Sequence, residues 1–331
     1  GAEPFIVSAM GSHGGGTEEG QREVLAGYGI TEERLGVPVV TTVDTVYLGN
    51  CANGRPVWFD RAAYEADLIV PINRVKLHTD FVGPIQSGLC KMLVIGLGNH
   101  KGCSAVHEEA PEVFADAIEE TARLILQKAP VGFGIAILEN AYDKTYAVEA
   151  VPAEHLVERE KELVQIAKGN MPYIMLDEAD VIVCGAIGKD ISGAGFDPNI
   201  LGRSSVLKQF VLHIPRYQRL VLCDVTPASH GNGIGVGLFD VITKKVAEQL
   251  DLESMYANAI ACNCLGDASV PCTVDDEETA IRVALKCCRN IDRDHPRIIR
   301  IQNTLHLGEI EVSEALLDAV RADSRMSLIE N

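Results

Sequence analysis

Short apolar runs alternate with helix-like patterns along almost the whole chain, and this alternation constrains the fold more than any other feature. Runs such as residues 4–10 (PFIVSAM), 66–72 (ADLIVPI) and 181–184 (VIVC) are typical of buried strands, and each leads into a loop. Strands that alternate with helices form parallel sheets covered by helices. The sequence therefore predicts an α/β fold with mostly parallel sheets.

The same patterns predict the individual elements. A helix is expected to begin at Thr17, because a threonine hydroxyl accepts hydrogen bonds from the free N–H groups of a first turn and acidic residues follow it. The helix over residues 153–169 is expected to end at Gly169. The remaining strands are expected at residues 37–43, 46–48, 56–59, 91–97, 133–139, 220–225 and 297–301, and the remaining helices at 110–128, 204–212, 239–249, 277–288 and 313–321.

The length of 331 residues suggests two domains, since a typical domain has about 150 residues. We place the boundary near residue 170, which gives an N-terminal α/β domain of residues 1–170 and a C-terminal α/β domain of residues 171–331. The sequence has no repeat and no long linker, so we expect the domains to enclose a shared active-site cleft. The chain begins without a methionine and almost directly at a strand-like run, so we also expect the first domain to continue upstream of residue 1.

The composition argues against several classes of function. Aspartate and glutamate number 47 against 29 lysines and arginines, a net charge of −18, which disfavours binding to nucleic acids or anionic membranes. The sequence has no apolar run of about 18 residues and no basic leader, so we expect a cytoplasmic protein without a membrane partner. The ten cysteines lack a CxxC repeat and several lie in apolar runs, which is typical of buried thiols in a reducing compartment.

Histidines gather in the loops after predicted strands, where α/β folds place their chemistry. His13 leaves the first strand, and three more follow later strands, namely His78, His100 and His107. A single histidine in such a loop is usually structural, but several at one rim of a sheet indicate a site. The glycine-rich loop SHGGG, which precedes a predicted helix, could also bind an anion there.

Four features together resemble a known family. They are MGSHGGGTEEG (10–20), the segment that begins VPINRVKLH and ends LVIGLG (70–98), the separation of 16 residues between Lys91 and His107, and IGKDISGAGFDPNILGR (187–203) with NTLHL (303–307). The chain resembles the nickel-dependent lactate racemase family and its wider set of 2-hydroxy-acid racemases and epimerases over most of its length. The resemblance implies an isomerase that inverts the C2 centre of a small 2-hydroxy acid.

The resemblance also implies a cofactor and roles for individual residues. The family binds a nickel-pincer nucleotide, the nickel complex of pyridinium-3-thioamide-5-thiocarboxylic acid mononucleotide, which takes up and returns the C2 hydride of the substrate. Lys91 matches the lysine that holds this cofactor covalently, and His107 matches the histidine that binds the nickel. His13 and His78 match the two histidines that act as acid and base on opposite faces of the substrate. Enzymes that make the cofactor are then expected as partners.

Cationic residues near these motifs are candidates for binding the anionic groups of cofactor and substrate. Arg74 and Lys76 follow a strand-like run and could bind the cofactor phosphate or the substrate. In the second domain, Lys189 and Arg203 flank one loop and are candidates for the substrate carboxylate, with Asn199 as a hydrogen-bonding neighbour. Because the chain as a whole is acidic, a local cationic patch is needed to attract such a substrate.

The sequence departs from the family in places that bear on the substrate. Gly14 and Gly15 stand where lactate racemases have arginine and proline, and Lys91 lies three residues further from His78 than in lactate racemase itself. These changes point to a hydroxy acid other than lactate. One alternative is a non-catalytic relative that binds an organic acid or a nucleotide. A divalent-metal hydrolase that uses the same histidines is less favoured, because no acidic residue lies at ligand spacing from them.

Overall fold

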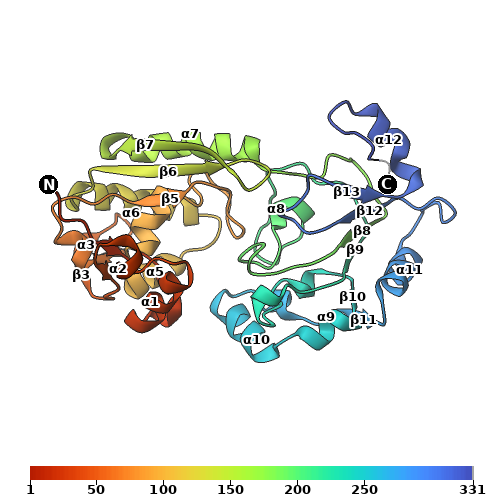
Figure 1. Ribbon diagram of the computed structural model, residues 1–331, viewed down its shortest axis with the longest axis horizontal. Helices are drawn as coiled ribbons and strands as arrows, with labels where there is room; N and C mark the ends of the chain where they lie inside the picture. The colour runs from red at the N-terminus through yellow and green to blue at the C-terminus, as the bar shows by residue number, and fades with distance from the viewer. Residues whose placement is uncertain (330–331) are drawn as a thin grey trace. The chain divides into compact units, whose positions relative to one another are not determined.

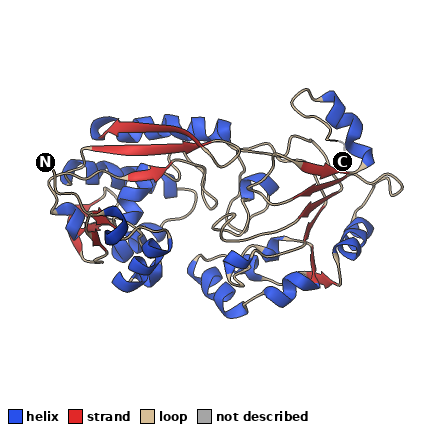
Figure 2. Cartoon of the chain, in the orientation of Figure 1, coloured by secondary structure: helices blue, strands red, loops and turns tan. Residues whose placement is uncertain are grey.

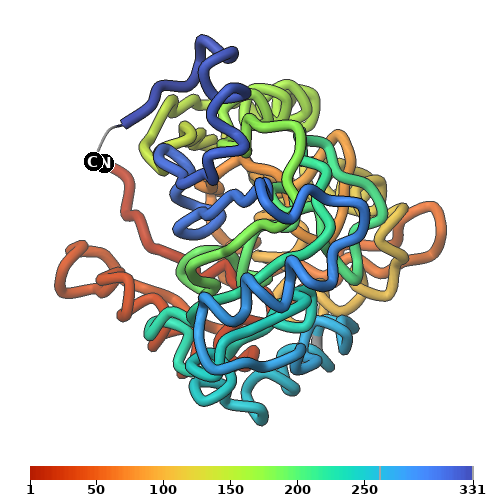
Figure 3. Tube along the Cα trace, turned by 90° about the vertical axis from the view of Figure 1, so that its right-hand side faces the viewer, coloured from red at the N-terminus to blue at the C-terminus, as the bar shows by residue number. Residues whose placement is uncertain are grey.

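The computed structural model describes residues 1–329 and divides into two compact units (Figures 1 and 2). The first unit consists of Gly1–Asn140 and Lys144–Asn170, and the second of Ala141–Asp143 and the chain from Met171 onward. The trace can be followed from one unit to the other in Figure 3. The predicted cleft between the two domains stays a prediction.

The main sheet of the first unit has the strand order β5-β6-β7. Strand β5 (Ile72–Arg74) pairs parallel with β6 (Phe133–Glu139), and β6 pairs antiparallel with β7 (Thr145–Pro152). Two smaller sheets complete the unit, a parallel pair and an antiparallel pair. They are formed by β1 (Ile6–Val7) with β2 (Val39–Val40), and by β3 (Thr45–Asn50) with β4 (Pro56–Asp60).

Helices surround these sheets, and α7 packs along β6 and β7 (Figure 1). Helix α1 begins as expected, because the Thr17 hydroxyl accepts a hydrogen bond of 3.1 Å from the backbone N–H of Gly20. The helices are α1 (Glu18–Gly27), α2 (Glu32–Leu35), α3 (Arg61–Tyr64), α4 (Leu89–Lys91), α5 (Asn99–His107), α6 (Phe114–Lys128) and α7 (Leu156–Asn170), with 3-10 turns η1 (Gly14–Gly16) and η3 (Ala153–His155) and the π-helix η2 (Met92–Gly96).

The strand expected at residues 91–97 is wrong, because this segment is helical. It forms the end of α4 and the π-helix η2, and α5 follows directly. Leu93 and Val94 are almost completely buried, so the apolar run faces protein on every side. A short run that is apolar throughout has the same sequence signature in a buried strand and a buried helix, and periodicity cannot separate the two.

The second unit contains a six-stranded sheet with the order β11-β10-β9-β8-β12-β13. All neighbours are parallel except β12 and β13, so the predicted α/β fold with mostly parallel sheets is confirmed. The strands are β8 (Val181–Cys184), β9 (Arg219–Leu222), β10 (Val241–Thr243), β11 (Cys272–Val274), β12 (Ile298–Ile301) and β13 (Ile310–Val312). The helices are α8 (Pro198–Leu201), α9 (Lys244–Gln249), α10 (Leu252–Ala261), α11 (Glu277–Cys287) and α12 (Leu317–Ala322), with 3-10 turns η4 (Pro227–Ser229), η5 (Val236–Leu238), η6 (Leu265–Ala268) and η7 (Glu314–Leu316).

This sheet is buried on both faces, which explains why its strands read as continuous apolar runs. Val181 and Val183 pack with buried residues of α11, whereas Ile182 faces a larger core that contains Phe196 and Phe239. No helix within residues 1–329 is both long and apolar enough to span a bilayer.

Two helices expected in the second unit are absent or shorter. Residues 204–212 form no helix, because the hydroxyl of Ser204 accepts hydrogen bonds from the N–H groups of Val206 and Leu207 and closes a local turn instead. The segment 239–249 begins as strand β10, whose β-branched residues pair with β9 and β11, and becomes helical only from Lys244.

The core of the second unit gives a first testable prediction. Phe196 is completely buried and its ring meets that of Phe239 edge-on, with a centroid distance of 5.3 Å. Phe196→Ala is expected to lower the free energy of unfolding by about 3–5 kcal/mol in urea denaturation. Tyr256→Ala is the control, because Tyr256 is 46% exposed and its removal should change stability by less than about 0.5 kcal/mol. Equal effects of the two substitutions would contradict this description of the core.

Candidate active site

The loop that carries His13 is held against the π-helix that follows Lys91. The N–H of Gly11 donates to the carbonyl of Gly96 at 3.0 Å. A Cβ atom at Gly96 would lie 2.6 Å from the carbonyl oxygen of Ala9, so the two segments can approach this closely only with glycine. His13 itself is exposed on this loop.

Lys91 and His78 meet side chain to side chain. Nζ of Lys91 lies 2.5 Å from Nε2 of His78, and the two residues come from separate segments of the first unit. Burial is the main cause that lowers the pKa of Lys91 to about 8, and Lys76 lowers it further, while Asp80 opposes the shift. Burial, followed by the charge of Lys91, holds the pKa of His78 well below its usual value of 6.5. The imidazole is therefore neutral at physiological pH.

The hydrogen bonds of His78 fix which of its nitrogens carries the proton. Its Nδ1 accepts a hydrogen bond of 3.0 Å from the backbone N–H of Asp80, so the single proton of the neutral ring lies on Nε2. Nε2–H can then donate to Nζ of Lys91 in those molecules whose lysine is a free amine. The geometry thus favours the nucleophilic form of Lys91, in agreement with its lowered pKa.

His107 ends helix α5, one turn after Cys103. Its Nδ1 donates to the carbonyl oxygen of Cys103 at 2.7 Å and lies 3.5 Å from the Cys103 sulfur. Burial raises the pKa of Cys103, but hydrogen bonds from His107 and Ser12 outweigh it and leave that pKa below its ordinary value. The contact with Cys103 in turn raises the pKa of His107. Because Nδ1 is occupied, Nε2 is the nitrogen that can bind a metal.

A row of aromatic rings connects the two histidine positions. The His78 ring stacks on Phe81 with a centroid distance of 4.3 Å, Phe81 contacts Phe114 at 4.8 Å, and Phe114 meets His107 at 5.1 Å. The charge of His107 also contributes to the lowered pKa of His78. On the other side, the hydroxyl of Ser12 lies 3.7 Å from the sulfur of Cys103, one helical turn before His107. The structure therefore brings Lys91, His78, His107 and the loop of His13 into one region of the first unit.

The two cations before His78 differ in their surroundings. Arg74 lies in β5, is exposed and forms an ion pair of 2.9 Å with Glu139. Lys76 is exposed and its backbone pairs with Ser87, and its charge lowers the pKa of both Lys91 and His78. Lys76 therefore acts on the lysine–histidine pair, whereas Arg74 is neutralised by a carboxylate.

The structure does not bring Lys189 and Arg203 together. Lys189 follows the carboxyl end of β8, where its Nζ donates to the carbonyl of Gly193 at 2.6 Å and to the side chain of Asn258 at 2.5 Å. Arg203 lies at the amino ends of β9 and β10, where it forms an ion pair of 2.7 Å with Asp240. Parallel sheets bind ligands at the carboxyl ends of their strands, so the position of Lys189 suits a ligand and that of Arg203 does not.

Asn199 lies in the interior of the second unit. Only 1% of its surface is exposed, and its amide donates to the carboxylate of Asp197, which caps α8. This arrangement supports a structural contribution to the loop that carries Lys189.

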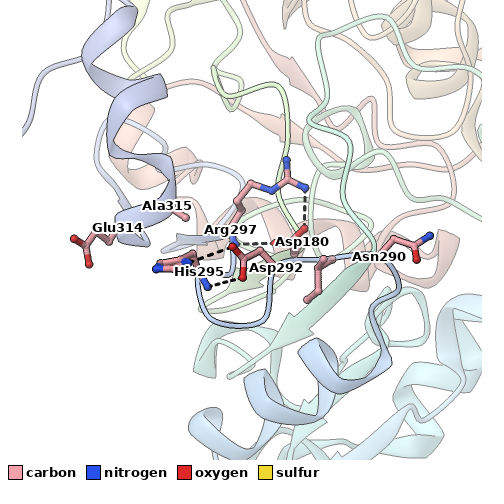
Figure 4. A pocket seen from close by; sticks show the side chains of 8 residues that line it. Asp180, Asn290, Asp292, His295, Arg297, Glu314 and Ala315 are labelled. Atoms are coloured by element: carbon pink, nitrogen blue, oxygen red, sulfur yellow. Dashed lines mark hydrogen bonds and ion pairs between the residues drawn. The ribbon is translucent and has the colours of Figure 1, made fainter.

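Two cavities in the described part of the second unit lie at the amino ends of its strands. One has a volume of about 450 Å³ and is lined by Asp180, Arg297 and His295, and Figure 4 shows Arg297 paired with Asp180. The other, of about 480 Å³, contains Arg203 and Asp240. Both are at the edge of the sheet opposite to the usual ligand edge. Neither contains a predicted catalytic residue.

The sequence analysis did not identify three residues that contribute to this site, namely Cys103, Phe81 and Glu160. Cys103 and His107 form a Cys-x3-His pair on one helix face, a spacing that is visible in the sequence. Phe81 has no sequence signal. Glu160 lies in the strongly charged run EREKE, which is typical of a solvent-exposed helix, and yet its side chain is completely buried.

The donor set in the described residues fits a cofactor that brings its own metal ligands. Residues 1–329 contain no group of three or more histidine, cysteine or carboxylate side chains that could hold a metal ion. Among these residues, His107 therefore has too few neighbouring ligands to complete the coordination sphere of a metal ion. A metal that is already bound by a cofactor needs only one such imidazole.

Comparison with known proteins finds one family match. Residues 2–116 match the family model for the lactate racemase N-terminal domain, and the predicted site residues of the first unit all lie within this segment. Over these residues the chain is similar to that domain. No curated protein matches the sequence at a significant level.

Two solved structures match this chain. The lactate racemase apoprotein from Thermoanaerobacterium thermosaccharolyticum has a TM-score of 0.51 and 14% sequence identity, and the match covers 92% of this chain and 78% of that one. This similarity shows the fold. A structural-genomics protein from Thermotoga maritima matches with a TM-score of 0.41 and 12% identity, over 88% of this chain and 70% of that one.

The lysine–histidine pair gives a second testable prediction. In competitive labelling with trace acetic anhydride, the reactivity of Lys91 should rise with a midpoint near pH 8, because its pKa is lowered to about 8. At pH 8 about half of Lys91 is then a free amine, against less than about 1% of an ordinary lysine. Peptide mass spectrometry measures both, with exposed Lys128 as the reference in the same digest. If Lys91 followed the same pH curve as Lys128, the pairing with His78 would be refuted.

Proposed function

We propose that the chain is a racemase or epimerase of a 2-hydroxy acid that works with a nickel-pincer nucleotide attached to Lys91. The observation that carries the proposal is the meeting of Lys91, His78, His107 and the loop of His13 in one region of the segment that matches the lactate racemase N-terminal domain.

Lys91 is suited to covalent attachment of the cofactor. A lysine attacks a thiocarboxylate carbon only as the free amine, and burial together with the Nε2–H of His78 favours that form. Attachment would join Nζ of Lys91 to the carbon of a thiocarboxyl group, with loss of the carbonyl oxygen as water and retention of the sulfur in a thioamide. The proposal therefore assigns the tether to a lysine whose surroundings already activate it.

His107 is suited to bind the nickel through Nε2. Its Nδ1–H donates to the carbonyl of Cys103, which fixes the ring and leaves Nε2 as the nitrogen that a metal could bind. Neutral imidazole is a good ligand for a borderline metal such as nickel. When bound, the cofactor would supply the group that accepts the hydride from C2 of the substrate.

His78 and His13 are proposed as the acid and base. The low pKa of His78 keeps its ring neutral, and the proton on Nε2 is the one that it could give to the substrate oxygen in one direction and regain in the other. His13 is exposed on a loop that is fixed by backbone contacts, so its ring is accessible to a substrate. Two histidines that exchange roles allow the reaction to run in both directions, which a racemase requires.

Lys189 is the candidate for the substrate carboxylate, because it lies at the ligand-binding edge of its sheet. Arg203 is left out of the proposal, since Asp240 already neutralises it. Arg74 is likewise paired, so Lys76 is the better candidate for the cofactor phosphate.

The proposal is tested by co-expressing the chain with the cofactor-making enzymes and following a panel of 2-hydroxy acids by chiral chromatography. Substrates deuterated at C2 are expected to racemise with the label retained, because the hydride returns to the same carbon. Loss of the label to solvent would point to proton abstraction at C2 and would refute the mechanism. Absence of racemisation by nickel-loaded protein across the panel would favour the non-catalytic relative.

A further inference from the structure

We propose that Glu160 is a positioning residue that holds Lys91 in place by capping the short helix from which Lys91 projects. Glu160 belongs to α7, far along the chain from Lys91, and none of its surface is exposed. A buried carboxyl group is unfavourable unless it serves a partner, so its contacts indicate its task.

The carboxyl group of Glu160 caps helix α4. Its Oε2 accepts a hydrogen bond of 2.8 Å from the N–H of Cys90, and the N–H of Leu89 also donates to it. Gly88, at the N-cap position, has no side chain that could accept these bonds. Glu160 therefore replaces the missing cap from a different helix, and Lys91 is the next residue of the capped turn.

Gly88 leaves room for this contact. A Cβ atom at position 88 would lie 2.6 Å from Oε1 and 2.7 Å from the carboxyl carbon of Glu160, so an added side chain would force this carboxyl group to shift. The backbone of Gly88 is extended, with φ near 175°, so this glycine is required by space and not by conformation. The close approach of Glu160 thus depends on the residue type at position 88.

One oxygen of the Glu160 carboxyl group could accept a further hydrogen bond. Oε1 of Glu160 is buried and has no hydrogen-bond partner within the described residues. Burial raises the pKa of Glu160 to about 7, and the bonds from Cys90 and Leu89 oppose this shift. The thiol of Cys90 is the titratable group next to this carboxyl group. The charges of Glu119 and Arg123 in α6 also affect the pKa of that thiol.

Glu160 acts on Lys91 through the backbone. The pKa of Lys91 is set first by burial and then by Asp80, Lys76 and Cys103, so the charge of Glu160 is not among its causes. A variant that keeps the capping oxygen and loses the charge should leave Lys91 unchanged. A variant that keeps the charge and shortens the side chain should release Lys91 into water and raise its pKa.

The test is competitive acetylation of Lys91 in the full-length apoprotein between pH 6 and 10, with Lys128 as reference. Glu160→Asp should move the Lys91 midpoint upward by about one pH unit, which lowers its labelling at pH 8 about fivefold. Glu160→Gln should keep the wild-type curve, because its amide oxygen can accept the same two hydrogen bonds. Glu162→Asp, on the exposed face of α7, is the matched control and should have no effect.

Gly88→Ala tests the same contact from the side of helix α4, since its Cβ must displace the carboxyl group of Glu160. This variant replaces Glu160→Asp in the test if circular dichroism shows that Glu160→Asp does not fold. An unchanged Lys91 curve in folded Glu160→Asp or Gly88→Ala would overturn the proposal, as would a shift in Glu160→Gln equal to that of Glu160→Asp. The importance of this positioning for cofactor attachment rests on the proposed function, but labelling of the apoprotein does not. A failed labelling test and a failed racemisation test are therefore distinguishable.

Discussion

Lys91→Ala protein, produced together with the cofactor-making enzymes, is expected to carry no cofactor mass and to lose racemisation by a factor of about 10³ or more. The reason is that the cofactor supplies the difficult chemistry and Lys91 is its proposed covalent anchor. Without the amine no covalent bond to the cofactor can form at this position. The single imidazole of His107 would then bind nickel only weakly. Intact-protein mass spectrometry measures the adduct, and elemental analysis measures the metal.

Lys101→Ala is the matched control for this experiment. Lys101 is an exposed residue of α5, and its ammonium group lies 5.0 Å from the centre of the Trp58 ring. Its removal should leave the adduct and the nickel content unchanged. Full nickel loading of the Lys91→Ala protein would show that the anchor has been assigned to the wrong residue.

His78→Ala is expected to lower racemisation by about 10²–10⁴-fold while the nickel content is retained, because general acid–base catalysis contributes about this factor. The imidazole is neutral and its Nε2 faces the attachment point at Lys91, so it can exchange a proton with a substrate bound there. His13→Ala should produce a loss of similar size, since each direction of the reaction needs both groups. Initial rates in both directions, measured by chiral chromatography, give the effect.

The comparison residue for these histidine variants is His155, which is exposed in the 3-10 turn η3 of the same unit. His155→Ala should leave the rate within about twofold of the unmodified protein. If His78→Ala kept its rate and lost the cofactor mass instead, His78 would serve attachment of the cofactor and not proton transfer. A rate that stayed unchanged in His13→Ala would remove that residue from the mechanism.

Much of the fold was predictable because local patterns and tertiary structure agree. The strand at Phe133–Glu139 and the strand at Val181–Cys184 have the predicted bounds, and α11 ends one residue before its predicted end. The segment after Lys91 was mispredicted, since a run that is apolar at every position has no periodicity to read. Strand β7 was missed because its alternation of exposed and half-buried residues is weak.

The candidate site was predictable to the extent that its residues lie in recognisable segments. Their proposed roles came from the resemblance to lactate racemases, which rests in part on the separation of Lys91 from His107 and on the sequence around His13. The candidates Lys189 and Arg203 are close in sequence but not in the structure. The segment between them, which includes the short helix α8, takes the chain from one edge of the sheet to the other.

The sequence by itself determined the α/β class, the acidic surface charge and the identity of the four residues proposed for cofactor and catalysis. These properties depend on composition, on periodicity and on short motifs, which are local along the chain. Only the tertiary structure decided that Lys91 meets His78, that His107 bonds back to Cys103, and that Glu160 caps the turn of Lys91. The physical reason is that protonation states and caps depend on burial and on partners distant in sequence, which no local pattern records.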